Sequence, residues 1–187
     1  KLPNNMIRKS LIMSNKKKVI LDCDPGHDDA FGIMIAVKHL NVLGITTIGG
    51  NSPLENVTTN AIKILEVLGE ADNIGVYPGH SCPMVAPLVT APQFHGVTGL
   101  DGPVLPDPVH KSQNKHAVDF IVDTVMSTDD VTLIATGPLT NIASAINREP
   151  RIVDRVKEIC IMGGSVTFGN WTPSAEFNIF VDPEAAS

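Results

Sequence analysis

The stretch VILDCDPGHDDA, residues 19–30, places four aspartates directly behind an apolar run. The run is rich in β-branched residues and is typical of a strand buried on both faces, whereas the residues after it have the apolar spacing of a helix. Carboxylates a few ångströms apart raise one another's pKa and destabilise the folded chain unless something neutralises them. Capping a helix needs one acid. A further role is therefore expected for Asp22, Asp24, Asp28 and Asp29.

A hard cation between the aspartates would remove this repulsion. Ca²⁺ takes about six to eight oxygen ligands and tolerates irregular geometry, whereas Mg²⁺ prefers a tight octahedron that retains waters. The stretch is not an EF-hand loop, because the twelfth place counted from Asp22 holds Ile33 instead of glutamate. The chain also has no GxxxxGK[ST] phosphate loop. A phosphatase of the Asp-x-Asp type stays open as a lesser alternative, although Pro25-Gly26 replaces the residues usual there.

Composition and charge restrict the class of protein. The chain has 187 residues, 43% of them hydrophobic and 18% charged, with a formal net charge of −6. These values favour a soluble globular domain, and the lack of a basic stripe argues against a nucleic-acid partner. The three cysteines lie far apart without metal-ligand spacing, so we expect reduced thiols and a cytoplasmic location. No apolar run approaches the roughly 20 residues of a membrane-spanning helix, so no membrane partner is predicted.

Strand and helix patterns alternate along the chain. Predicted strands cover residues 18–24, 42–48, 74–77, 131–135 and 158–162, and predicted helices cover 28–40, 53–68, 114–126 and 138–146. The alternation predicts an α/β fold with a mostly parallel, doubly wound (Rossmann-like) sheet and helices on both faces. Residues 78–111 are dense in proline and glycine, and we expect this long irregular segment to be functional.

Ligands of such sheets bind outside the carboxyl ends of the strands. The segments that follow predicted strands are the aspartate cluster, Gly49-Gly50-Asn51, Thr136-Gly137 and Gly163-Gly164. We therefore expect these segments to converge at one rim of the sheet.

The two ends of the chain set the expected domain limits. Residues 1–17 mix basic residues with a very short apolar patch, and we interpret them as a disordered leader or cloning remnant. Asp182 and Pro183 are typical of the N-cap and first turn of a helix, yet the chain stops at Ser187. Residues 18–187 are thus expected to be the N-terminal part of a single α/β domain that is truncated at the C-terminus.

Several ordered motifs resemble those of one enzyme family. DCDPGHDDA, residues 22–30, is similar to the DxDPGxDDA signature of nucleoside hydrolases, which cleave the N-glycosidic bond of ribonucleosides with a bound Ca²⁺. The similarity continues through GGN (49–51), HGVTGLDGP (95–103), TGPLTNIA (136–143) and MGGSVTFGNWTPSAEFNIFVDPEAA (162–186). It covers residues 18–187 and looks most like the inosine-uridine preferring type.

The resemblance implies roles for individual residues. Asp24 would bind the metal and act as general base on the metal-bound water, Asp29 would be a second carboxylate ligand, and Thr136 would coordinate through its backbone carbonyl. The positions that match substrate-binding residues are Asp28, Asn51, His95, Met162, Asn170, Glu176 and Asn178. Taken singly, each asparagine is as well explained by a turn, and Met162 by core packing. Asp22 and His27 receive no catalytic role, and Asp22 is expected to bond nearby backbone.

The function implied by the resemblance is hydrolysis of ribonucleosides to ribose and free base. The protein would be a Ca²⁺-dependent ribonucleoside N-glycosidase of nucleoside catabolism and salvage, acting as a homodimer or homotetramer. The leaving-group acid and a further metal ligand would follow Ser187, so we expect little or no activity from this segment alone. The only tryptophan, Trp171, is not at the position of His95, which favours pyrimidine or broad specificity. A non-catalytic nucleoside- or ribose-binding protein stays open beside the phosphatase.

Overall fold

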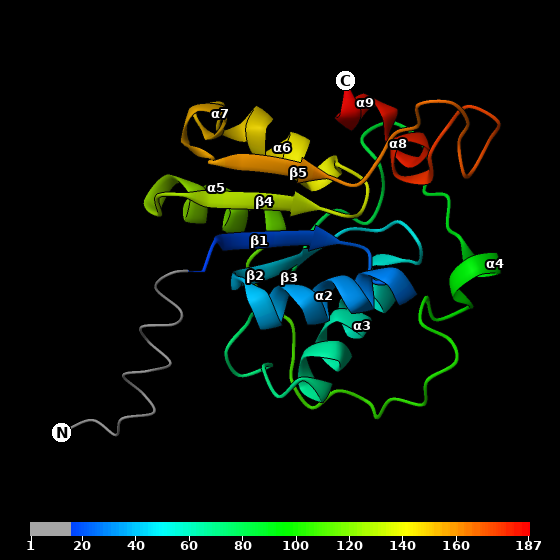
Figure 1. The fold of residues 1–187 in the computed structure, drawn as a ribbon, viewed down its shortest axis with the longest axis horizontal. Coiled ribbons are helices and arrows are strands. Elements are labelled where there is room, and N and C mark those ends of the chain that lie inside the picture. Colours follow the sequence, from blue (N-terminus) through cyan, green and yellow to red (C-terminus); the bar gives the residue numbers. More distant parts are fainter. Residues whose placement is uncertain (1–15) are drawn as a thin grey trace.

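A parallel sheet forms the centre of the computed structural model, which describes residues 16–187. The strand order is β3-β2-β1-β4-β5, and every neighbouring pair is parallel. The strands are β1 (Lys18–Cys23), β2 (Asn41–Thr47), β3 (Val76–Pro78), β4 (Val131–Ala135) and β5 (Glu158–Ile161). The doubly wound α/β fold predicted from the sequence is confirmed (Figure 1). Most of the leader predicted over residues 1–17 lies outside the described residues.

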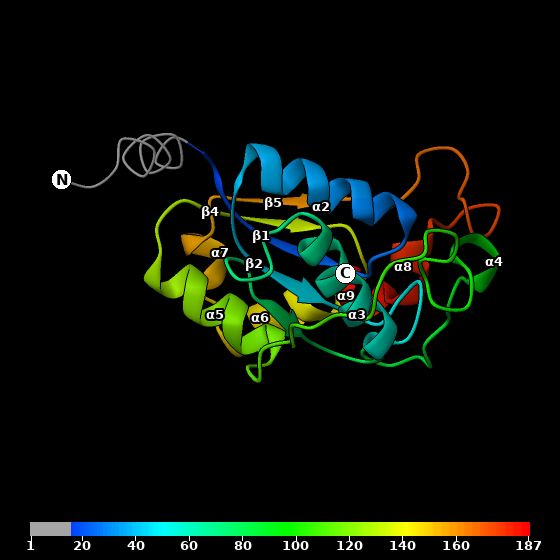
Figure 2. The same ribbon diagram turned by 90° about the horizontal axis from the view of Figure 1, so that it is seen from below.

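Helices cover both faces of the sheet, as α2 on one side and α5 and α6 on the other show in Figure 2. The longer helices are α2 (His27–His39), α3 (Leu54–Val67), α5 (Ala117–Ser127) and α6 (Thr140–Arg148). The short ones are α4 (Pro92–His95), α7 (Ile152–Arg155), α8 (Phe177–Val181) and α9 (Pro183–Ala186). Within residues 16–187, none of the helices combines the length and the apolar character that crossing a bilayer requires.

The central strand β1 is buried on both faces. Val19, Leu21 and Cys23 pack with α2 and α3, whereas Ile20 packs on the opposite side with α5, α6 and α7. Successive side chains of a strand point to opposite faces, so a strand between two helical layers has no solvent-facing side. The core position predicted for Cys23 is confirmed. Burial of each large apolar side chain here contributes about 1.5–3 kcal/mol to folding.

Side-chain caps set the start of some helices, and several short helices are present that the sequence patterns did not predict. α5 begins at Ala117, later than predicted, because Nδ1 of His116 accepts the backbone N–H of Val118 at 3.2 Å. The N-cap predicted at Asp182 is confirmed, since its side chain accepts the N–H of Ala185 at 3.0 Å. The sequence patterns did not predict α4, α7 or α8, which have four or five residues each. Such helices are too short to show a 3.6-residue period.

Asp22 lies completely buried at the carboxyl end of β1. Its Oδ1 accepts hydrogen bonds from the hydroxyl of Thr46 (2.5 Å) and from the side-chain amide of Asn141 (2.9 Å). The same amide donates to the carbonyl of Thr47 (3.0 Å), and Oδ1 of Asn141 accepts the backbone N–H of His80 (3.0 Å). The expectation that Asp22 bonds backbone is therefore wrong. Side chains hold it, and they tie β1, β2 and the segment after β3 to α6.

Replacing Asn141 by alanine is expected to lower the free energy of unfolding by about 2–4 kcal/mol, because buried partners of its amide lose their hydrogen bonds. The exposed Asn147 of the same helix provides the matched control, and Asn147→Ala should change stability by less than about 0.5 kcal/mol. Urea denaturation of both variants measures the difference. Equal stabilities of the two variants would contradict the view that Asn141 ties β1, β2 and the segment after β3 to α6.

Candidate active site

The predicted convergence of segments at the carboxyl rim of the sheet is confirmed. β1 lies between β2 and β4, so the chain leaves the sheet in opposite directions on the two sides of β1. Such a switch point is where open α/β sheets bind ligands. Asp24 follows β1, Asn51 follows β2 and Thr136 follows β4. The segment after β5 joins them through Asn178, whose side-chain amide donates to the carbonyl of Thr136 at 2.9 Å, and Gly164 of the same segment donates its N–H to Glu176 at 3.1 Å.

Asp24 is completely enclosed at this rim, with an exposed fraction of 0%. Its Oδ2 accepts the backbone N–H of Asn51 at 2.6 Å, and the Asn51 side-chain amide donates to the Asp24 carbonyl at 3.1 Å. A Cβ on Gly50 would lie 2.1 Å from Oδ2, so a larger residue there would displace the carboxylate. Oδ1 has no hydrogen-bond partner among residues 16–187.

Asp29 lies beside Asp24 in the first turn of α2 and is 6% exposed. Burial, together with the Asp29 charge, raises the pKa of Asp24 well above its usual value. Burial also raises the pKa of Asp29 to about 7, and the charge of Asp28 adds to this. The two carboxyl groups are therefore held next to each other without enough compensating charge.

Helix capping does not account for the aspartates. The N-cap position of α2 is Gly26, and no side chain caps the helix there. Asp28 is instead exposed toward a cavity, and Asp29 is buried behind it. A Cβ on Gly26 would lie 2.6 Å from Nδ1 of His95, so the glycine of the turn is required by the packing of that ring.

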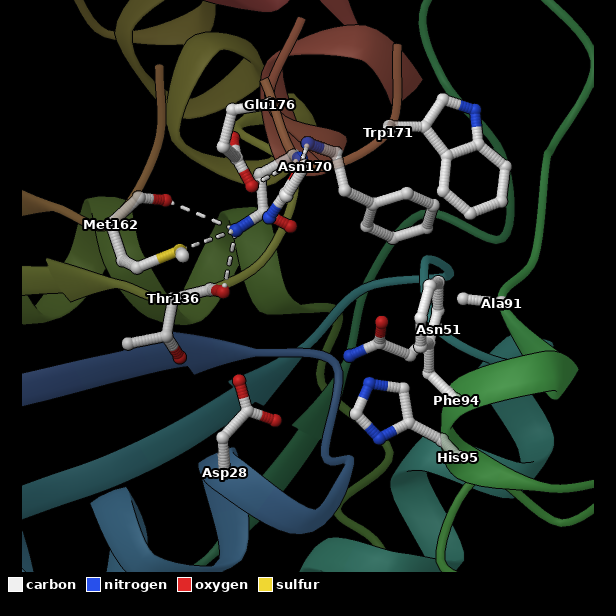
Figure 3. Close-up of a pocket in the computed structure, with 12 residues that line it drawn as sticks. Asp28, Asn51, Ala91, Phe94, His95, Thr136, Met162, Asn170, Trp171 and Glu176 are labelled. Atoms are coloured by element: carbon white, nitrogen blue, oxygen red, sulfur yellow. Dashed lines mark hydrogen bonds between the residues drawn. The ribbon is translucent and has the colours of Figure 1, made fainter. Parts of the chain in front are cut away.

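A cavity of about 290 Å³ opens at the rim, and its walls differ in chemistry (Figure 3). The polar lining residues are Asp28, Asn51, Thr136, Asn170, Glu176 and Asn178. The other lining residues are Ala91, Phe94, His95, Met162, Trp171 and Phe177. Figure 3 shows Asp28, Thr136 and Met162 on one side and Phe94 and Trp171 on the other. This arrangement suits a ligand that has hydroxyl groups at one end and a flat ring at the other.

The sequence-predicted residues come together at this cavity. All seven residues predicted to bind substrate line it, as does Thr136. Asp24 and Asp29 do not line the cavity and lie behind its wall. Asp24 contacts Asn51, and Asp29 is next to Asp28.

Three of the polar lining residues also build the wall. Glu176 caps α8 by accepting the backbone N–H groups of Asn178 (3.0 Å) and Ile179 (3.2 Å). The amide of Asn178 donates to the carbonyls of Thr136 (2.9 Å) and Met162 (3.0 Å). Oδ1 of Asn170 accepts the N–H of Phe177 at 2.8 Å. These bonds fix the side chains before any ligand arrives, so structural and binding roles are compatible here.

Sequence reasoning missed the aromatic wall. The rings of Trp171 and Phe177 have centroids 4.9 Å apart, and those of Phe94 and Trp171 are 6.4 Å apart. Trp171 lines the same cavity as His95 although the two positions are far apart in the chain. The only signal in the sequence was the occurrence of aromatic residues in two otherwise irregular segments.

The donor atoms around Asp24 fit a hard cation. They comprise two buried carboxylates with raised pKa values, of which Oδ1 of Asp24 has no hydrogen-bond partner among residues 16–187, and the side chain of Thr136 lies next to Asp29. A bound cation would offset the desolvation and repulsion of the two acids. Residues 16–187 bring no third His, Cys, Asp or Glu side chain to a common point with them. The pair is therefore suited to a cation that completes its shell with other ligands.

Comparison with known proteins gives one consistent family. A family model described as inosine-uridine preferring nucleoside hydrolase matches residues 19–187. The chain is 48% identical over 174 residues to the pyrimidine-specific ribonucleoside hydrolase RihB of Escherichia coli O1:K1 / APEC, covering 91% of this chain and 55% of that relative.

Solved structures agree with the sequence comparison. The purine-preferring ribonucleoside hydrolase from Gardnerella vaginalis matches with a TM-score of 0.86 and 36% identity, covering 91% of this chain and 56% of that one. The plant nucleoside hydrolase PpNRh1 matches with a TM-score of 0.85 and 39% identity, covering 91% and 55%. The chain spans about half the length of the relatives that it matches.

The metal-free chain is expected to lose stability as the pH rises from about 5 to about 8. A carboxyl whose pKa is higher in the folded than in the unfolded state binds its proton more tightly when folded, so deprotonation favours unfolding. For Asp29, with a folded pKa of about 7, the loss should be about 3 kcal/mol over this range. Urea denaturation in EDTA measures it.

Asp29→Asn should remove this part of the pH dependence, whereas the exposed Asp154→Asn should retain it. Asp22, whose burial raises its pKa to about 6, contributes equally to all three proteins and cancels in the comparison, whereas Asp24 loses the Asp29 charge that helps to raise its pKa, so the comparison measures the coupled pair. An identical slope in the wild type and Asp29→Asn would show that Asp29 is not the destabilising acid.

Proposed function

The chain belongs to the inosine-uridine preferring nucleoside hydrolase family, and on this premise we propose that the full-length protein hydrolyses ribonucleosides to ribose and a free base. The observation that carries the proposal is the buried Asp24–Asp29 pair directly behind a cavity with one polar and one aromatic wall. Family membership leaves the Asp-x-Asp phosphatase without support. The non-catalytic binding protein becomes an outcome of the tests below.

We propose Asp24, Asp29 and the carbonyl of Thr136 as the groups that would hold Ca²⁺. When bound, Ca²⁺ would orient the attacking water and lower the pKa of that water. Asp24 would accept the proton, since its Oδ1 has no hydrogen-bond partner among residues 16–187 and it would lie beside the water that the cation orients. Asn51 would keep Asp24 in place through the 2.6 Å bond to Oδ2.

The polar wall would bind the ribose. Asp28 faces the cavity and can accept hydrogen bonds from vicinal hydroxyls, and Asn170 and Glu176 lie on the wall after β5. The C1′–N bond would break as the water oxygen attacks C1′, and the departing base would take a proton. Prepositioned donors and acceptors favour such a step because they need no reorganisation as charge develops on the sugar.

The Asp24→Asn variant of the full-length protein should release reducing sugar from uridine or inosine at least roughly 10³-fold more slowly than the wild type in Ca²⁺, because it loses the base and a ligand. Asp154→Asn should retain wild-type turnover, since this exposed residue lies on α7. Wild-type protein that binds nucleosides without turnover would support the non-catalytic alternative and contradict the proposal.

We further propose a preference for pyrimidine ribonucleosides, supported by the 48% identity to a pyrimidine-specific relative against 36% to a purine-preferring one. The kcat/KM for uridine or cytidine is expected to exceed that for inosine by roughly 10-fold or more, a ratio within reach of pocket shape alone. Steady-state kinetics with the three nucleosides measures the ratio. An equal or higher value for inosine would contradict this preference.

A further inference from the structure

His27 contacts His95 through both its backbone and its ring, although the two residues are 68 positions apart. The backbone N–H of His27 donates to Nδ1 of His95 at 3.4 Å, and the two Nδ1 atoms are 3.2 Å apart. The rings are stacked with centroids 5.4 Å apart and planes inclined by 25°. Together with the close approach to Gly26, these contacts keep Nδ1 of His95 against the start of α2.

The other side of the His27 ring is anchored to the loop that follows His95. Its Nε2 lies 2.7 Å from the carbonyl of Asp101, which can only accept, so Nε2 donates. Asp101 closes this loop. Its carboxylate accepts the backbone N–H groups of Val97 (2.9 Å) and Thr98 (3.0 Å), and its own backbone N–H donates to the backbone carbonyl of His95 at 3.1 Å. His27 thus bridges the ring of His95 and the loop that supports it.

The consequence is that the second ring nitrogen of His95 faces the cavity. Because Nδ1 is held at α2, the nitrogen that Figure 3 shows directed toward Asn51 is Nε2. His95 also belongs to α4, which supplies Phe94 to the aromatic wall. A rotation of the His95 ring would therefore change the hydrogen-bonding group presented beside that wall and beside Asn51.

We propose that His27 is a positioning residue that acts through His95 and determines how the cavity recognises the nucleobase. This inference rests on the proposed function, because the base is the part of the ligand that would lie against the aromatic wall. His27 does not line the cavity, so its effect on the ligand passes through His95. Ligands that carry only the sugar are bound at the other wall and do not sense it.

A double-mutant cycle in the full-length protein tests this coupling. His27→Ala should lower kcat/KM for the preferred nucleoside by roughly 10-fold or more in the wild-type background, and by less than about 3-fold in the His95→Ala background. An iminoribitol without a base should inhibit wild type and His27→Ala equally, within about 3-fold. His39→Ala, at the exposed far end of α2, is the matched control and should behave as wild type. Additive effects of the two substitutions, or an equal loss of iminoribitol binding, would overturn the proposal.

Histidine-selective ¹⁵N NMR provides a readout independent of turnover. In the wild type, the Nδ1 and Nε2 signals of His95 should be well separated, as for a ring held in one tautomer. In His27→Ala they should move toward each other as the ring exchanges between tautomers. Unchanged signals would overturn the positioning role even where the enzyme is active. Absence of wild-type turnover would contradict the proposed function alone, since the NMR comparison still decides the role of His27.

Discussion

Two carboxyl groups buried side by side at the end of β1 set the constraint on which the rest of the site depends. Asp24 has no exposed surface, and burial raises the pKa values of both Asp24 and Asp29. Such a pair destabilises a fold unless a cation or protons compensate it. The surrounding chain nevertheless keeps the pair in place, with a glycine at position 50 and a backbone N–H from Asn51 directed at Asp24. A chain that maintains an unfavourable arrangement so closely is expected to use it.

The parallel topology explains why the supporting residues come from distant parts of the sequence. β1 is central, so the loops after β2 and β4 reach it from both sides, and the segment after β5 completes the wall through Glu176 and Asn178. Asp22 stabilises this arrangement by accepting a hydrogen bond from Asn141, which is 119 residues away and lies on α6. The cavity that results has a polar and an aromatic wall, which matches the two halves of a nucleoside and links fold to proposed function.

Much of this could be predicted from the sequence, because the decisive signals are local. The apolar run before Asp24, the helical spacing after it and the glycine-containing segments after each strand indicate a parallel sheet and its functional rim. The partners of Asp22 and His27 could not be predicted, since contacts over 119 and 68 residues leave no local pattern. The aromatic wall was missed for a related reason: Phe94 and Trp171 lie in segments without a period, and only the folded chain brings them together.

The central claim is that Asp24 and Asp29 form one cation site that serves catalysis at the adjacent cavity. A crystal structure of the full-length protein with Ca²⁺ and a non-hydrolysable nucleoside analogue tests it most directly. We predict a cation about 2.3–2.6 Å from carboxylate oxygens of Asp24 and Asp29 and from the carbonyl of Thr136, with the ribose beside Asp28. A turnover-competent protein whose cation lies elsewhere, or whose carboxylates stay uncoordinated at saturating Ca²⁺, would contradict the claim.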